Sequence, residues 1–371
     1  MGASTSRVPH PDAVVKWYRT KLTKEQHKAL HQRSNVQAFI QTLAFFGMLV
    51  TWFALALYFF SENRVTLAAV FVSLYGMQSN FLINAMHELG HGSVFKSKFL
   101  NALFMRIFSF LGWLHPDMFF SSHLRHHRYT QNFPHDQENP MRESVEGPPK
   151  PVILTFKRFL LFGFINFRGF YDIMEQTIRA AAGVYPTKHL WWTPMWEDVC
   201  YPPAKAAARL LPMRWAQFML FGHAAIAVVS IVNAWYLVPV MLSLGPFING
   251  WLFFLCNSTQ HVGMHHGNFN GDGDSGVVND FRLSTRSFYL NNPIVRCWYW
   301  HMNFHIEHHM YAAVPCYHLA ALHEAIKHDL PPTPNGLIAV WKEIIKVTRQ
   351  QIKDPNFVSA ISLPNGKKKV N

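Results

Sequence analysis

Long apolar stretches without charged residues divide the chain into membrane-spanning and polar parts. The first two cover Val36–Phe60 and Val65–Met86 and are separated by only four residues. Residues 215–271 contain no Asp, Glu, Lys or Arg, which leaves room for two more apolar helices, over Trp215–Ile231 and Tyr236–Leu255. About 20 apolar residues suffice to cross the hydrocarbon core of a bilayer. The pattern predicts an all-α, multi-pass membrane protein with four transmembrane helices in two hairpins.

Two further segments are apolar but interrupted by charge. Phe99–Ser122 contains Arg106 and Asp117, and charges at these positions favour an interfacial or re-entrant helix over a fifth span. Val152–Val184 carries six charged residues and is typical of a helix that lies along the membrane surface. Residues 133–151, which are rich in proline and charge, are expected to form a loop. The sequence therefore predicts interfacial helices beside the spanning ones.

The polar segments set the expected orientation of the chain. The first 35 residues carry seven basic and two acidic side chains, and basic segments stay on the cytosolic side of a membrane. Four crossings then place residues 87–213, and everything after about residue 256, in the cytosol as well. The expected organisation is a cytosolic N-terminal segment (residues 1–35), a membrane domain (36–330) and a cytosolic C-terminal tail (331–371).

Composition supports a membrane protein and draws attention to histidine. Only 15% of the 371 residues are charged, whereas soluble domains have about 25%. The net charge is +13, and the basic residues lie in the polar segments between the apolar stretches. A membrane surface is therefore the expected partner rather than nucleic acid. The four cysteines show no CxxC spacing, which argues against a thiolate metal site. The 22 histidines exceed ordinary usage, and many of them are clustered.

The clustered histidines have the spacing of metal ligands. They read HELGH from His87, HLRHH from His123 and HIEHH from His305, and a separate NSTQH ends at His261. Residues three or four apart lie on one face of a helix, so their imidazoles can reach one metal ion. All the clusters fall near helix ends on the expected cytosolic side. Nine histidines are too many for one four-coordinate ion, so the sequence predicts two ions with four or five ligands each.

These motifs resemble those of the integral-membrane fatty acid desaturase and hydroxylase superfamily, over roughly residues 65–325. The resemblance implies two iron ions at the cytosolic face. The implied ligands are His87, His91, His123, His126, His127, His261, His305, His308 and His309. It also implies that Asn257 approaches a metal through water. Glu88, Glu307, His265 and His301 are expected to lie next to the ligands without binding metal.

The motifs depart from two branches of that superfamily. The first box has three intervening residues rather than the four of the acyl-CoA stearoyl-type desaturases. The third box opens with His305 rather than the glutamine of front-end desaturases fused to cytochrome b5. Because the sequence has no HPGG haem motif, electrons are expected from a separate protein such as cytochrome b5 or ferredoxin.

The resemblance implies O₂-dependent oxidation of an unactivated C–H bond in a lipid acyl chain, and a fatty acid desaturase is the favoured interpretation. The same ligands would serve a hydroxylase, an acetylenase or a ketolase, which remain alternatives. HELGH also fits a zinc metalloprotease with Glu88 as general base, but this alternative leaves the other seven histidines unexplained. A non-catalytic zinc protein leaves most of the clusters without a purpose.

The sequence contains three weaker motifs. Residues 268–279 begin like a calcium loop, but position 12 is Asn279 rather than Glu. We instead expect a polar turn that brings Asp280, Arg282 and Arg286 toward the third box, where they could meet a lipid head group or the electron donor. Residues 1–6 fit an N-myristoylation pattern, and the two lysines at 368 and 369 resemble a retrieval signal of the endoplasmic reticulum.

Overall fold

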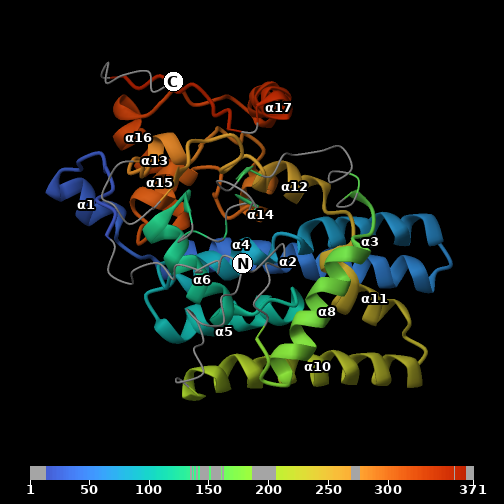
Figure 1. Cartoon of the computed structure of the whole chain (residues 1–371). Coiled ribbons are helices and arrows are strands. Elements are labelled where there is room, and N and C mark those ends of the chain that lie inside the picture. The colour runs from blue at the N-terminus through green and yellow to red at the C-terminus, as the bar shows by residue number, and fades with distance from the viewer. Residues whose placement is uncertain are drawn as a thin grey trace, which may run out of the picture.

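The computed structural model describes residues 14–133, 163–185, 206–268, 276–354 and 356–364, together with Asp136, Glu138, Leu160 and the pairs 141–142 and 150–151. Helices account for nearly all of the regular structure in these residues, and the strands are pairs of two residues each. A layer of long apolar helices carries at one end a cap of short helices, and the tips of the hairpins lie at the other end (Figure 1). This arrangement confirms the prediction of an all-α, multi-pass membrane protein.

The first predicted hairpin is present. Helix α2 (Asn35–Ser61) begins where the Ser34 side chain accepts a hydrogen bond from the backbone N–H of Gln37. Helices α3 (Val65–Ser79) and α4 (Leu82–Gly90) follow one another closely and together form an apolar helix of 26 residues, which is long enough to cross a membrane. The helices α2 and α3 pack side by side along their length (Figure 1). The hairpin thus carries the first histidine box, in α4, to the base of the cap.

The second hairpin differs from the prediction in its returning arm. Helix α10 (Ala206–Val232) is long and apolar, but Tyr236–Leu255 is divided into α11 (Leu237–Leu244), the 3₁₀ turn η1 (Gly245–Phe247) and α12 (Trp251–Asn257). Pro246 lacks an N–H donor, and Asn249 has a φ of 52°, so a continuous helix cannot pass here. Within the described residues three helices are long enough to span a membrane. The predicted count of four is not confirmed.

The break in the returning arm packs closely against α3. A Cβ atom placed on Gly76 would lie 2.7 Å from the Cβ atom of Ile248. The side-chain amide of Asn80 donates to the Ile248 carbonyl at 2.9 Å, which satisfies a backbone group that the interrupted helix leaves unpaired. Because glycine permits this approach, α12 is directed back to the cap, and His261 follows it closely.

The segment expected to hold one interfacial helix forms two. Helix α5 (Lys98–Leu111) and helix α6 (Pro116–Tyr129) are joined by a short turn, and neither is long enough to span a membrane. Pro116 occupies the first turn of α6, where a missing N–H is tolerated. The two charges that interrupt the segment, Arg106 and Asp117, pair with each other at 2.8 Å across the turn. The turn directs α6 back toward the interior of the protein, and α6 carries the second histidine box.

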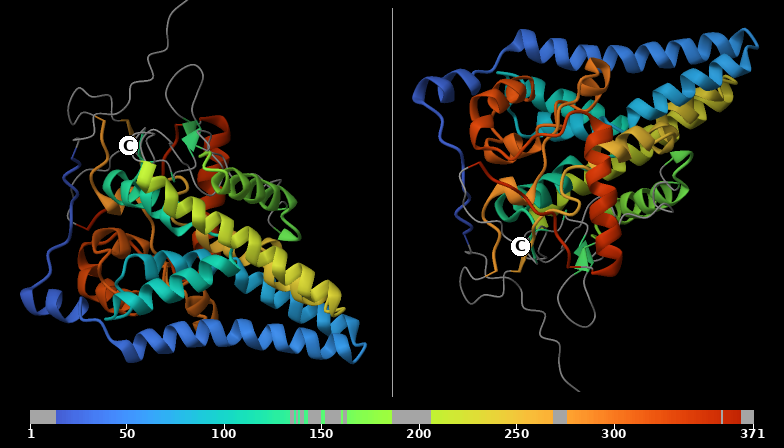
Figure 2. Two further views of the ribbon diagram at one scale, coloured as in Figure 1. Left: turned by 90° about the horizontal axis from the view of Figure 1, so that it is seen from below. Right: turned by 90° about the horizontal axis from the view of Figure 1, so that it is seen from above.

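Helix α8 (Phe167–Ala181) lies beside α10 (Figure 2). It covers part of Val152–Val184, and residues 152–159 lie outside the described part of the chain. Ile173, Thr177 and Ala180 are buried on one face, whereas Arg168 and Tyr171 are exposed on the other. This amphipathic pattern agrees with a helix that packs on the spanning helices by one side.

The cap is assembled from short elements that are mostly distant from one another in sequence. Its helices are α1 (Lys24–Leu30), α13 (Phe281–Ser284), α14 (Pro293–Trp298), α15 (His305–Met310), η2 (Cys316–His318), α16 (Leu319–Ile326), η3 (Lys327–Asp329) and α17 (Leu337–Lys353). Two-residue strands β1 (Asn132–Phe133) and β4 (Gly267–Asn268) pair in parallel, and β2 (Met141–Arg142) pairs with β3 (Lys150–Pro151) in antiparallel fashion. Helix α17 lies in the segment expected to be a tail and packs against α12.

Aromatic side chains join the cap to the spanning helices. Trp300 is fully buried, and its ring centroid lies 5.8 Å from that of Phe45 on α2 and 6.2 Å from that of Phe108 on α5. Large aromatic side chains supply much of the apolar area that a core buries. The cap therefore packs against the spanning helices near the ends of α4 and α6, where the first two histidine boxes lie.

Candidate metal centre

The structure brings all nine predicted histidines together in two groups. They come from α4, from α6, from the turn after α12 and from α15. We call the first the five-histidine group (His87, His91, His123, His127 and His308) and the second the four-histidine group (His126, His261, His305 and His309). Within each group, the nitrogen atoms that could bind a metal all lie within 4.8 Å of one another.

In the five-histidine group the Nε2 atoms converge. The Nε2 atom of His91 lies 3.4 Å from that of His87 and 3.2 Å from that of His123. His127 continues the cluster, with its Nε2 atom 2.9 Å from that of His123 and 3.2 Å from that of His308. Three separate elements thus place five ring nitrogens around one point.

The four-histidine group is built in the same way. The Nε2 atom of His305 lies 2.9 Å from that of His261 and 3.1 Å from that of His309. His126 completes the group, since its ring centroid lies 4.9 Å from those of His261 and His309. All four rings are largely enclosed by protein.

The opposite nitrogen of most of these rings meets an oxygen. Nδ1 of His87 lies 2.9 Å from Glu88, Nδ1 of His123 lies 2.8 Å from Glu138, and Nδ1 of His126 lies 3.0 Å from Asp136. Nδ1 of His261 lies 3.0 Å from the Ser284 carbonyl, which can only accept a hydrogen bond. These contacts hold the hydrogen on Nδ1 and leave Nε2 with its lone pair.

His309 is oriented by a hydroxyl instead. The Thr130 hydroxyl donates its hydrogen to the His126 carbonyl at 2.6 Å. Toward Nδ1 of His309, 3.1 Å away, Thr130 can therefore only accept. This contact also directs the Nε2 lone pair of His309 into its group.

The lone pairs that converge in each group cannot satisfy one another, and they fit metal ions. Burial lowers the pKa of His91 to about 4 and that of His261 to about 3, so both are neutral at pH 7, as metal ligands must be. Burial also disfavours the charged form of His126, but the neighbouring Asp136 outweighs it and raises the pKa. Five and four imidazole nitrogens suit two first-row transition metal ions, and iron is among them.

Two carboxylates that orient the rings, Asp136 and Glu138, were not predicted from the sequence. Asp136 also accepts from the backbone N–H of Gln131 at 2.7 Å and from that of Glu138 at 3.1 Å, so its position is well defined. Burial raises the pKa of Glu138 to about 8. Both lie about ten residues after the second histidine box, in a stretch expected to be only a loop. The presence of acidic residues at that distance from a histidine box is the sequence signal that could have identified them.

The other residues named from the sequence lie at different distances from the two groups. Glu88 contacts His87, as expected. Asn257 is exposed at the end of α12, and its approach to a metal through water stays a prediction. Nε2 of His265 bonds to the Ser359 carbonyl at 3.0 Å, and His301 is outside both groups.

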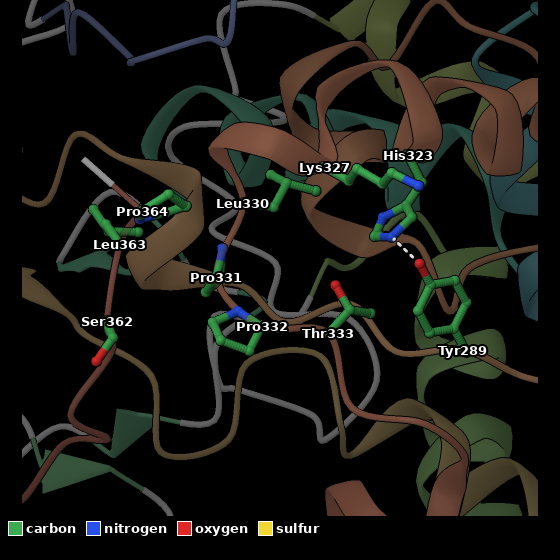
Figure 3. Close-up of a pocket in the computed structure, with 10 residues that line it drawn as sticks. All are labelled: Tyr289, His323, Lys327, Leu330, Pro331, Pro332, Thr333, Ser362, Leu363 and Pro364. Carbon is green, nitrogen blue, oxygen red and sulfur yellow. Dashed lines mark hydrogen bonds between the residues drawn. The ribbon is translucent and has the colours of Figure 1, made fainter.

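Glu307 was also expected next to the ligands, and its carboxylate bonds to residues outside both groups. It accepts from the Ser287 hydroxyl at 2.5 Å and from Nδ1 of His323 at 2.5 Å. Nε2 of His323 in turn meets the Tyr289 hydroxyl at 2.9 Å, at the edge of a surface pocket of about 380 Å³ (Figure 3). Glu307 thus ties α15 to α16 and fixes the third box from behind.

The segment of Asp280, Arg282 and Arg286 lies toward the third box as expected, since α13 contacts α15. The two arginines, however, are buried rather than exposed to a head group or an electron donor. Arg282 is buried and pairs with Asp280 at 2.7 Å and with Asp329 at 2.6 Å. Arg286 is buried as well and donates to the Thr259 carbonyl at 2.8 Å. Both guanidinium groups bind protein oxygens and hold the cap together. Residues 269–275 of the loop that precedes them lie outside the described part of the chain.

The sequence was compared with known protein families. A family model described as fatty acid desaturase matches residues 63–341, which are 279 of the 371 residues. The matched range contains both histidine groups and the carboxylates that orient them. No curated protein matches the chain.

Proposed function

The chain belongs to the fatty acid desaturase family, and we propose that it uses O₂ and two iron ions to introduce a double bond into a lipid acyl chain. Membership makes it an oxidoreductase of lipid metabolism, in agreement with its apolar spanning helices. The observation that carries the proposal is the pair of buried groups in which nine imidazoles turn their free Nε2 atoms inward. We propose these nine residues as the iron ligands.

The proposed metal pair would supply the activation of O₂ that removal of hydrogen from an unactivated methylene requires. The protein's own groups prepare the site for it. Glu88, Asp136 and Glu138 hold the Nδ1 hydrogens and so keep the rings in one tautomer. Burial keeps water away from the two groups, which protects a reactive centre from side reactions.

An apolar cavity next to the five-histidine group supports a lipid substrate. It is lined by Met86, which precedes His87, and by Phe119, whose ring stacks on that of His123 with centroids 4.8 Å apart. Ile173, Phe247 and Phe253 are among the other residues that line it. Methylene groups are the chemistry that such a wall accommodates.

The setting of Glu88 argues against the metalloprotease alternative. The carboxylate is 1% exposed and lies against Nδ1 of His87. A general base must reach a water molecule bound to the metal. In this site Glu88 stands behind a proposed ligand rather than beside the metal, which is the position of an orienting group.

We further propose that the protein acts in the endoplasmic reticulum with both termini in the cytosol, and that cytochrome b5 or ferredoxin delivers the electrons. The excess of basic residues before the first span supports a cytosolic N-terminus. The myristoylation pattern and the lysine pair at 368 and 369 lie outside the described residues.

The test is expression in a yeast host, with iron analysis of the purified protein and lipid profiling by mass spectrometry. We expect two irons per chain and a new double bond that requires O₂. His126→Ala should lose iron and product, whereas His27→Ala, a change at an exposed histidine of α1, should lose neither. Full activity of His126→Ala would refute the ligand assignment. A hydroxylated, acetylenic or ketone product would replace desaturation by the corresponding reaction of the same site.

A further inference from the structure

A buried histidine lines the apolar cavity beside the five-histidine group. The cavity has a volume of about 60 Å³ and lies between the α3–α4 junction, the α5–α6 turn, α8 and η1. His115, in the α5–α6 turn, lines it and is 3% exposed. A buried polar atom without a hydrogen-bond partner is costly, so each such atom in a cavity needs an explanation.

Two other polar side chains of the cavity, those of Asn80 and Trp113, use their hydrogens within the protein, and Gln176 also lines the cavity. The Asn80 amide donates to the carbonyls of Gly76 and Ile248 at 2.7 and 2.9 Å. The Trp113 indole N–H donates to the Ser243 carbonyl at 2.8 Å. These N–H groups are therefore already paired and are not available to a ligand.

The tautomer of His115 follows from its one neighbour. The Thr177 hydroxyl donates its hydrogen to the Ile173 carbonyl at 2.7 Å, so toward Nε2 of His115, 2.9 Å away, it can only accept. The hydrogen of the imidazole is therefore on Nε2. Burial lowers the pKa of His115 to about 3, so the ring is neutral and Nδ1 carries a free lone pair.

Nδ1 of His115 is buried and has no hydrogen-bond partner among the residues that the structure describes. It is an acceptor that requires a donor, on a residue that lines a cavity with many apolar side chains in its wall. A hydroxyl on an aliphatic chain satisfies both requirements. We propose that the cavity selects a lipid whose chain carries a hydroxyl group, and that this hydroxyl donates to Nδ1 of His115.

The position of the cavity connects this selection with the chemistry. Met86 and Phe119 stand between the cavity and the five-histidine group, and Phe119 stacks directly on His123. A chain anchored at His115 would present the carbons near its hydroxyl toward that group. This last step rests on the proposed function, which supplies the oxidation. The hydroxyl preference itself is a property of binding.

The test measures binding without turnover. Purified protein in detergent, without reductant, is titrated with radiolabelled octadecanoate and with a positional series of monohydroxy-octadecanoates. We expect at least one hydroxylated isomer to bind about tenfold more tightly than octadecanoate, which is the effect of one neutral hydrogen bond. His115→Phe, which keeps a ring but removes the acceptor, should reduce that ratio to about one.

Matched variants keep the test decisive. His223→Phe changes another buried histidine, but both of its nitrogens bond within the protein, to Ser243 and to Phe110, so the ratio should persist. If His115→Phe fails to fold, Thr177→Val and Thr177→Ser replace it. Valine frees the imidazole to place its hydrogen on Nδ1 and should lower the ratio, whereas serine should preserve it.

Equal binding of every isomer to the unchanged protein would overturn the proposal. A ratio that survives in His115→Phe, or in Thr177→Val where that variant replaces it, would overturn it as well. Because no step of the assay requires oxidation, loss of the hydroxyl preference leaves the proposed desaturation standing. Conversely, a protein that binds the hydroxylated chain but yields no oxidised product would contradict the proposed function alone.

Discussion

Replacement of Asp136 by Asn is the most informative test of the outer partners of the proposed metal centre. The carboxylate accepts three N–H groups, from Nδ1 of His126 and from the backbones of Gln131 and Glu138. Asparagine has nearly the same shape but exchanges one oxygen for an NH₂ group. That NH₂ must face one of the three donors, so at least one hydrogen bond is lost and a repulsive contact replaces it.

The size of the effect can be worked from these contacts. A hydrogen bond to a charged group contributes about 1.5–3 kcal/mol. Loss of an outer partner of a metal-binding histidine typically lowers metal affinity by about 10–100-fold, which corresponds to about 1.4–2.8 kcal/mol. The two ranges agree. Asp136→Asn should therefore weaken iron at the four-histidine group by about 10–100-fold and leave the five-histidine group nearly unchanged.

The assay is iron retention during titration with a colorimetric chelator. The unchanged protein should release two irons per chain over a narrow range of chelator, and Asp136→Asn should release one of them early. Glu175→Gln is the matched control, because Glu175 forms an exposed pair with Arg179 on α8, and such pairs contribute little. Identical release curves for Asp136→Asn and the unchanged protein would refute the assigned role of Asp136.

Three further predictions concern stability. Between about pH 5 and 8 Glu138, whose pKa burial raises to about 8, is protonated in the folded state and ionised in the unfolded one, and His126, whose pKa Asp136 raises, acts in the same direction. Above about pH 7 the buried histidines of lowered pKa are neutral in both states, so the unfolding free energy of the metal-free protein should fall as pH rises toward 8, and Glu138→Gln should flatten the dependence of its melting temperature. Arg282→Ala should destabilise the cap by about 3–5 kcal/mol, because Asp280 is left buried without its partner; a melting temperature within a degree of the original would contradict this. Gly76→Ala should lower the melting temperature by forcing α3 away from Ile248, and an unchanged value would show that the break in the returning arm can shift freely.

The sequence by itself determined the class of the protein and the histidines of its candidate site. Apolar length alone predicts helices that span a bilayer, because a helix satisfies its backbone hydrogen bonds within a single segment in lipid. Histidines three and four residues apart share a helix face whatever surrounds them. The nine residues that meet in the structure are therefore the nine that the sequence indicated.

Only the tertiary structure decided how those residues divide. His126 and His127 are neighbours in sequence but lie about 100° apart around α6, so each faces a different group. His308 and His309 separate in the same way on α15. Spacing alone cannot reveal this division, because it depends on which helix faces each side of the box.

The orienting carboxylates and the broken arm were likewise decided by packing. Asp136 reaches His126 because residues after α6 turn back over that helix, and no periodicity encodes such a turn. The Tyr236–Leu255 segment has enough apolar residues to cross a membrane, but Pro246 and the close contact of Ile248 with Gly76 divide it. Composition measures what a segment can bury, whereas the contacts with neighbouring helices decide where it bends.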